Sequence, residues 1–81
     1  MNFRSILESK IDITIIKKLA KKAFGKDFDK VEENSTSALI YLKSSVKEVR
    51  YKDLVVFATN SVSYTIGDVY FLKGTYIIEV Y

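Results

Sequence analysis

Cysteine, histidine and proline are absent from this sequence of 81 residues. Without cysteine there is no disulfide and no thiolate metal site, and without histidine no imidazole serves as a base or ligand. The groups that remain for catalysis or ligand binding are carboxylates, lysine, tyrosine, hydroxyls and the backbone. Without proline no strand is barred from a sheet centre, but one usual means of blunting sheet edges is missing. We therefore expect no metal or cofactor, and sheet edges protected by lysines, helices or a second subunit.

Long apolar runs are also missing. The sequence shows no signal-peptide pattern at its start, and no stretch approaches the roughly 20 apolar residues that cross a bilayer. These features predict an intracellular, cytoplasmic protein with no membrane association, in a host cytoplasm if the source is viral. The length fits a single domain, 1–81, with a small core and a narrow margin of stability.

The charge is unevenly distributed. Residues 1–30 hold eight basic and four acidic side chains, a net of +4, whereas residues 31–81 hold five and six, a net of −1. Lysine outnumbers arginine eleven to two, and isoleucine, asparagine, phenylalanine and tyrosine are frequent, which suggests an AT-rich coding sequence. Small size and this composition suggest a virus or mobile element as the source.

The first 25 residues are predicted to be basic and helical, in two helices. Phe3, Ile6 and Leu7 recur at helical spacing. A second helix should begin after Asp12, which can cap it, and end at Gly25. One continuous helix would place the first apolar set on the lysine face, so the chain should break between Lys10 and Asp12. The alternation of Ile11 to Ile15 leaves a short strand as the alternative.

Residues 38–81 are predicted to form an antiparallel sheet. The runs rich in strand-forming residues are 38–43, 46–51, 54–59, 62–66, 69–72 and 75–81. Short turns separate them, including Gly67 with Asp68 and Lys73 with Gly74. The predicted class is α+β, with two short N-terminal helices packed on an antiparallel meander of about five strands. Several strands are apolar on both sides, which predicts a homodimer through the sheet, with a curled, barrel-like sheet as the alternative.

Two groups of residues are candidate binding sites. The first is a basic stripe on the second helix and just beyond it, formed by Lys17, Lys18, Lys21, Lys22 and Lys26. Such a stripe could contact phosphates or an acidic protein, although lysines also simply solvate the outer face of an amphipathic helix. The second is a set of aromatic side chains expected on the sheet face away from the helices, Tyr41, Tyr51, Tyr70 and Tyr81. These rings could anchor a partner or stack on bases, or be ordinary strand residues.

The acidic residues give no catalytic pattern. Asp27, Asp29, Glu32 and Glu33 form the main cluster, but lysines interleave with them and the spacing fits no calcium loop, so a solvated turn or short helical segment is expected. The favoured function is a small non-enzymatic interaction protein, a regulator or inhibitor that binds a protein partner, itself, or both. A nucleic-acid-binding module using the basic stripe is the alternative, and a carboxylate-dependent hydrolase or nuclease is the third class.

Overall fold

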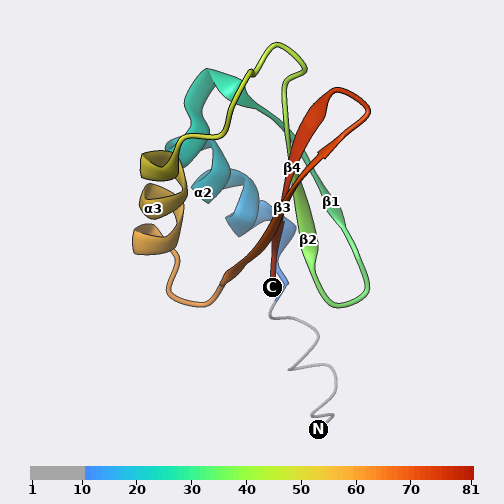
Figure 1. Ribbon diagram of the computed structural model, residues 1–81. Helices are drawn as coiled ribbons and strands as arrows, with labels where there is room; N and C mark the ends of the chain where they lie inside the picture. Colours follow the sequence, from blue (N-terminus) through green and yellow to red (C-terminus); the bar gives the residue numbers. More distant parts are fainter. Residues whose placement is uncertain (1–10) are drawn as a thin grey trace, which may run out of the picture.

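The computed structural model describes residues 11–81, which form an α+β domain with one four-stranded antiparallel sheet (Figure 1). The predicted first helix, around Phe3, Ile6 and Leu7, lies outside the described residues. The elements in chain order are α2 (Ile13–Phe24), the 3-10 turn η1 (Gly25–Asp27), β1 (Phe28–Glu33), β2 (Ala38–Leu42), α3 (Tyr51–Asn60), β3 (Ile66–Leu72) and β4 (Thr75–Val80).

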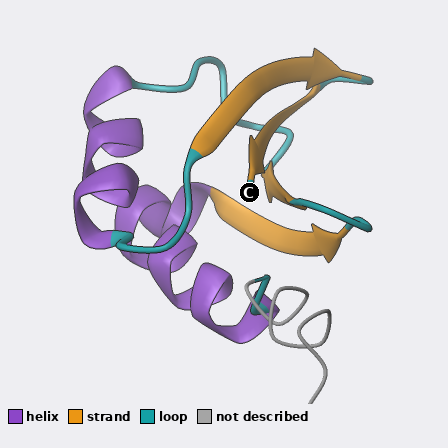
Figure 2. Ribbon diagram, turned by 90° about the horizontal axis from the view of Figure 1, so that it is seen from below, coloured by secondary structure: helices purple, strands orange, loops and turns teal. Residues whose placement is uncertain are grey.

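The strand order is β1-β2-β4-β3, so the last strand in the sequence is inserted between β2 and β3. The predicted antiparallel sheet is confirmed, but the five-stranded meander is wrong. Both helices lie on one side of the sheet, with α2 against β1 and β2, and α3 against α2 (Figure 2). No element of residues 11–81 covers the opposite side, which we call the outer face.

Helix α2 begins where the sequence predicts. The carboxylate of Asp12 accepts hydrogen bonds from the amides of Thr14 and Ile15, at 3.0 and 3.3 Å, and so satisfies donors that a helix start leaves free. The amide of Asp12 itself donates to the hydroxyl of Tyr64, at 3.0 Å, which ties the helix start to the segment before β3. The strand alternative for this region is therefore wrong. Gly25, with φ of 59°, ends the helix as predicted.

Helix α3 occupies a segment that the sequence analysis assigned to strands. The predicted strand 54–59 is helical, and the predicted strand 46–51 is a loop up to Arg50. Val55 and Val56 favour strands, but Phe57 becomes almost fully buried in the shared core when this segment is helical. The gain from burying Phe57 outweighs a propensity difference of a few tenths of a kcal/mol per residue. Of the two α-helices within residues 11–81, the second therefore lies between β2 and β3, in the part of the chain predicted to be sheet.

Strand β1 replaces the predicted acidic turn or short helix. Asp29, Glu32 and Glu33 all lie on β1, and Asp27 lies on η1 just before it. The strand is charged because it is an edge strand whose side chains are largely exposed, while Phe28 is buried and Val31 is half-buried. Pairing with β2 therefore overrides the low strand propensity of its charged residues.

The predicted turn at Gly67 and Asp68 is also wrong, since both residues lie within β3 next to an irregularity in its pairing with β4. The predicted strand 62–66 contributes only Ile66 to the sheet. Gly67 has a packing role instead of a turn role. A Cβ atom there would lie 2.6 Å from Cε2 of Tyr81, so glycine admits the Tyr81 ring against the strand.

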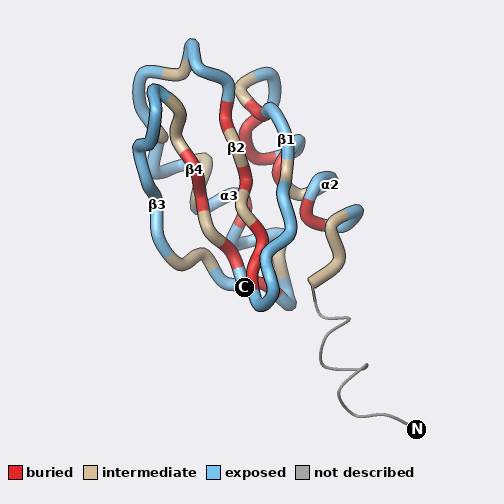
Figure 3. Tube along the Cα trace, turned by 90° about the vertical axis from the view of Figure 1, so that its right-hand side faces the viewer, coloured by how far each residue is buried: buried red, intermediate tan, exposed pale blue. Residues whose placement is uncertain are grey.

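The core lies between the helices and the sheet (Figure 3). It includes Ile16, Ala20 and Phe24 of α2 and Phe57 of α3. From the sheet, alternate residues of β2 and β4 enter it, Ala38, Ile40, Leu42, Ile78 and Val80. The remaining alternate residues of these strands therefore point to the outer face.

Candidate functional site

A row of four side chains crosses the outer face in register. Lys30 on β1 is opposite Tyr41 on β2, Tyr41 is opposite Ile77 on β4, and Ile77 is opposite Tyr70 on β3. Ile77 is only 5% exposed although no described element lies over it. We attribute this burial to the tyrosines on either side, whose rings shield it from water.

Tyr41 is held by charged neighbours on β1. Its hydroxyl donates to Glu32 at 3.0 Å, and Nζ of Lys30 lies 3.0 Å from the other Glu32 oxygen and 4.9 Å from the centre of the Tyr41 ring. The hydrogen bond to Glu32 raises the pKa of Tyr41, and hydrogen bonds from Lys30 and Tyr41 lower the pKa of Glu32. The three side chains form one exposed polar cluster at the charged edge of the sheet.

Tyr70 is held in a similar way at the opposite edge. Its hydroxyl donates to Glu79 at 2.9 Å, and the other oxygen of Glu79 accepts a hydrogen bond from Ser37 at 3.1 Å. The bond to Glu79 raises the pKa of Tyr70. Each tyrosine of the row is therefore fixed by one glutamate, and both glutamates are already occupied by protein hydrogen bonds.

A hollow of about 390 Å³ opens on the outer face at the end nearest the β3–β4 turn. We call it the outer groove. Its lining residues are Asp29, Lys30, Tyr41, Leu72, Lys73, Thr75 and Ile77. Tyr41, Ile77 and Leu72 provide apolar surface, while charged side chains of both signs line it at β1 and at the turn. This combination suits a segment that inserts an apolar side chain between polar neighbours.

The neighbouring edge of the sheet is apolar and is covered by no other element of residues 11–81. Val69, Tyr70, Phe71 and Leu72 of β3, the apolar edge, are 41%, 41%, 62% and 56% exposed. Figure 3 shows β3 as exposed along most of its length, in contrast to β2 and β4. The ring of Phe71 packs on Tyr76 with centroids 4.7 Å apart, and both line a hollow of about 330 Å³ beside Val46. Exposed apolar side chains on a strand edge mark a surface that can accept another strand.

The two other predicted tyrosines lie apart from this row. Tyr51 opens α3 and is 79% exposed, so it does not lie on the sheet. Tyr81 follows β4, and its backbone exchanges two hydrogen bonds with Thr65, with N to O distances of 2.6 and 2.9 Å. Its ring lies against Gly67, away from the outer groove.

The lysines of the predicted basic stripe are all exposed. Lys17, Lys18, Lys21 and Lys22 all lie on the exposed side of α2, and Lys26 follows on η1. Among residues 11–81, no carboxylate lies within ion-pair distance of these lysines. Nζ of Lys22 donates to the side chain of Asn60 at 3.3 Å, which links α2 to the end of α3.

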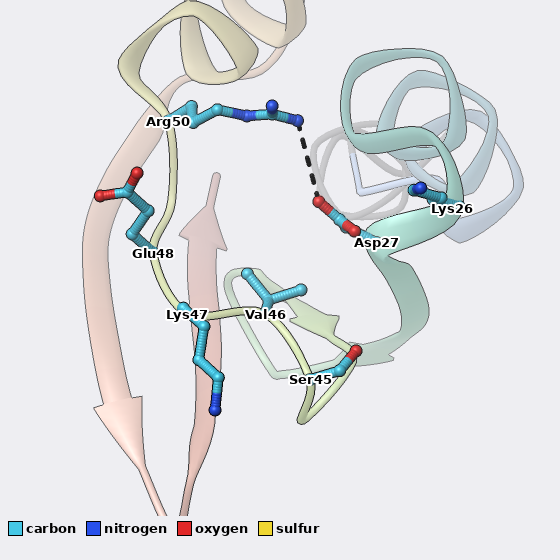
Figure 4. A pocket seen from close by; sticks show the side chains of 7 residues that line it. All are labelled: Lys26, Asp27, Ser45, Val46, Lys47, Glu48 and Arg50. Atoms are coloured by element: carbon cyan, nitrogen blue, oxygen red, sulfur yellow. Dashed lines mark ion pairs between the residues drawn. The ribbon is translucent and has the colours of Figure 1, made fainter.

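A third hollow, of about 290 Å³, lies between η1 and the loop that leads into α3 (Figure 4). Arg50 and Asp27 point toward each other across it, with 3.9 Å between their charged atoms, and Arg50 also pairs with Asp53 at 3.3 Å. Lys26, Lys47 and Glu48 contribute further charges of both signs. The ion pair holds the loop against η1, so we interpret these charged residues as stabilising the fold and not as a binding site.

The acidic residues do not form a metal site in the described part of the chain. No group of three potential ligands among histidine, cysteine, aspartate and glutamate comes together in residues 11–81. In the same range, no helix has both the length and the apolar character that crossing a membrane requires.

No protein-family model matches this chain, and neither curated proteins nor solved structures show significant similarity to it. The candidate site therefore rests on geometry alone. Sequence reasoning placed Tyr41 and Tyr70 among the candidates but did not connect them with Lys30, Glu32 and Glu79, which hold them, or with Leu72, which shares the groove. No local pattern marks β1, because Phe28 and Val31 are three residues apart rather than two and the pairing with β2 is irregular between Phe28 and Lys30.

Proposed function

We propose that this protein is a small non-enzymatic interaction protein, a regulator or inhibitor, that binds a segment of a protein partner in the outer groove. The observation that carries the proposal is the combination of apolar surface at Tyr41, Ile77 and Leu72 with charges of both signs around it. Interfaces between proteins commonly place apolar anchors in such pockets and surround them with polar groups.

The state of the carboxylates supports a binding role over a catalytic one. General acid–base catalysis needs a carboxyl group that is free to exchange a proton with a substrate. On the outer face, Glu32 bonds to Lys30 and Tyr41, and Glu79 bonds to Ser37 and Tyr70. The bonds to Glu32 stabilise its ionised form, and the bonds to both glutamates fix the tyrosines, which is what a preformed binding surface requires.

The charges around the groove favour a protein partner over a nucleic acid. A groove for nucleic acid tracks phosphates with one sign of charge and offers free aromatic faces for stacking. Here Asp29 lies beside Lys30 in the groove lining, and Lys30 is positioned over the ring of Tyr41. The face of the Tyr41 ring is already occupied by the ammonium group of Lys30, so a nucleobase could stack there only by displacing Lys30.

The basic stripe supports nucleic-acid binding as the second candidate function. The specific observation in its favour is four neighbouring exposed lysines on α2 without an ion-pair partner among residues 11–81. Phosphate contacts of this kind would make binding fall steeply with salt. Replacing Lys17, Lys18, Lys21 and Lys22 with glutamate would then abolish nucleic-acid binding while leaving the circular dichroism spectrum unchanged.

Capture from a lysate of the source organism tests the two candidates together, with nuclease-treated and untreated samples compared. We expect a protein to be retained after nuclease treatment, and to be lost with Thr75→Arg, which places a long charged side chain in the groove. Thr65→Arg is the matched control, because Thr65 is exposed and lies outside the groove.

Equal retention by both threonine variants would remove the outer groove as the binding site. Retention that disappears with nuclease, and with the glutamate substitutions on α2, would favour the basic stripe instead.

A further inference from the structure

The apolar edge lacks the protection that the other edge of the sheet has. On β1, Asp29, Lys30, Glu32 and Glu33 are all exposed, and charged side chains disfavour the approach of another strand. On β3, four consecutive apolar residues are exposed instead, from Val69 to Leu72. Of the two edges, β3 is therefore the one built to accept a further strand.

The register with β4 identifies the backbone groups that are free on this edge. Lys73 and Gly74 both have positive φ, 53° and 80°, as in the two-residue turns whose flanking residues form a hydrogen-bonded pair. That pair is Leu72 and Thr75, and hydrogen-bonded pairs alternate along an antiparallel ladder. The register thus directs the backbone of Tyr70 toward β4 and the backbone groups of Val69 and Phe71 toward the open side.

We propose that the apolar edge pairs with the apolar edge of a second copy of this chain, antiparallel, with Tyr70 opposite Tyr70. In this register Val69 of each copy is opposite Phe71 of the other, so the free backbone groups of both copies are satisfied together. Pairs of an aromatic and a β-branched side chain are also favourable across strands. Two four-stranded sheets become one sheet of eight strands.

The charges at the ends of the apolar edge favour a second copy in this orientation. Asp68 precedes the edge and Lys73 follows it. Antiparallel self-pairing brings the acidic end of each copy alongside the basic end of the other, whereas parallel pairing would place like charges together. The edge is therefore self-complementary in one direction only.

The exposed area of the apolar edge determines how tightly two copies should associate. With roughly 150 to 250 Å² per aromatic side chain, the exposed parts of Tyr70 and Phe71 amount to about 200 Å² per copy. Even with Val69 and Leu72 added, the interface stays below the roughly 1,200 Å² at which standard-size interfaces begin. We expect a reversible dimer with a dissociation constant on the order of micromolar or weaker.

Sedimentation of the full chain tests the dimer between roughly 5 and 500 µM, a range suited to weak interfaces. The mass should rise from 9.3 kDa toward twice that value as concentration increases. Phe71→Lys should weaken association by about tenfold or more, because the charge would be buried in the interface. The control Val62→Lys makes a similar change at a fully exposed valine outside the edge and should leave association unchanged.

A cysteine tests the register. The register makes Tyr70 a non-hydrogen-bonded pair across the two-fold axis, with Cα atoms about 4.5 Å apart, which is within disulfide range. The chain has no cysteine, so Tyr70→Cys should give a covalent dimer on mild oxidation without background. Leu72→Cys, whose two copies would be several residues apart, should crosslink far more slowly.

A wild-type mass that stays at 9.3 kDa throughout would overturn the proposal, as would unchanged association of Phe71→Lys. Equal crosslinking at positions 70 and 72 would overturn the register. The capture experiment with Thr75→Arg tests binding in the outer groove independently of the dimer. The absence of a dimer and the absence of binding in the groove would therefore give different results.

Discussion

The two outer strands of the sheet, β1 and β3, close it with opposite kinds of residue. Strand β1 carries charged side chains along its length and meets α2 on its inner side, whereas β3 exposes apolar side chains from Val69 to Leu72. Each edge takes part in holding one tyrosine on the outer face: Glu32 of β1 accepts a hydrogen bond from Tyr41 of β2, and Tyr70 of β3 donates one to Glu79 of β4. The charged side chains of β1 disfavour pairing with another strand, whereas we propose that the apolar side chains of β3 accept one.

Removing a side chain between the two edges should have the largest effect. Ile78 is fully buried on β4 and is opposite Ile40 on one side and Val69 on the other. Ile78→Ala should lower the free energy of unfolding by about 2 to 5 kcal/mol, through lost burial and a cavity. Val69→Ala, at the open edge, should lower it far less. Urea denaturation of both variants measures the contrast, and similar losses would show that β3 is anchored as firmly as β4.

Making β1 resemble β3 should create a second point of association. In the double variant Asp29→Val with Glu33→Val, the charged edge loses two charges and gains two apolar side chains, while the ion pair of Lys30 and Glu32 is kept. Light scattering should then detect species larger than a dimer. The control, serine at both positions, removes the same charges without adding apolar surface and should not associate further. Higher species in the control would mean that charge alone protects this edge.

A substitution at Gly67 should have a moderate effect that is confined to β3. Gly67→Ala places a Cβ atom against the Tyr81 ring and should destabilise the protein by about 1 kcal/mol, the low end for overpacking, since an exposed ring can shift. Adding Tyr81→Ala should remove most of the penalty from the steric contact. Denaturant midpoints for the single and double variants measure this coupling, and additive losses would argue against the contact.

The smallest effect concerns Tyr41 and Tyr70, each held by a glutamate near one edge of the sheet. A hydrogen bond to a glutamate favours the neutral phenol, so the pKa of Tyr41 and of Tyr70 is higher in the folded chain than in the unfolded one. Their contribution to stability is complete below the unfolded pKa near 10 and is lost as pH rises through the folded pKa. Glu79→Gln should lower the pKa of Tyr70 and leave that of Tyr41 unchanged, as read by NMR titration. A shift in both would show that the two clusters are coupled across Ile77.

Local signals in the sequence predicted helix α2 and the β3–β4 turn well. Asp12 and Gly25 are residue types that begin and end helices, and lysines alternate with apolar residues at helical spacing between them. Lys73 and Gly74 adopt the positive φ values that a two-residue turn needs. In both cases the information lies within a few residues, so no distant contact is required to interpret it.

The elements that were predicted wrongly from the sequence are determined by contacts between residues far apart in the chain. Val55 and Val56 resemble a strand, but the burial of Phe57 against α2 makes the segment helical. The segment of β1 is rich in charged residues, as turns often are, and it becomes a strand because it pairs with β2. The same limit applies to the candidate site, because Lys30, Tyr41 and Tyr70 come together only through the strand order.

That strand order also has a consequence for how the chain folds. Strand β4 is the last of the four in the sequence but lies between β2 and β3, and its pairing with β2 joins residues about forty positions apart. During synthesis, β1 and β2 can form a hairpin early, but the sheet stays in two parts until β4 has emerged. Contacts of such long sequence separation slow folding. The nascent chain should therefore expose its central strands to chaperones or aggregation for longer than a meander of equal size.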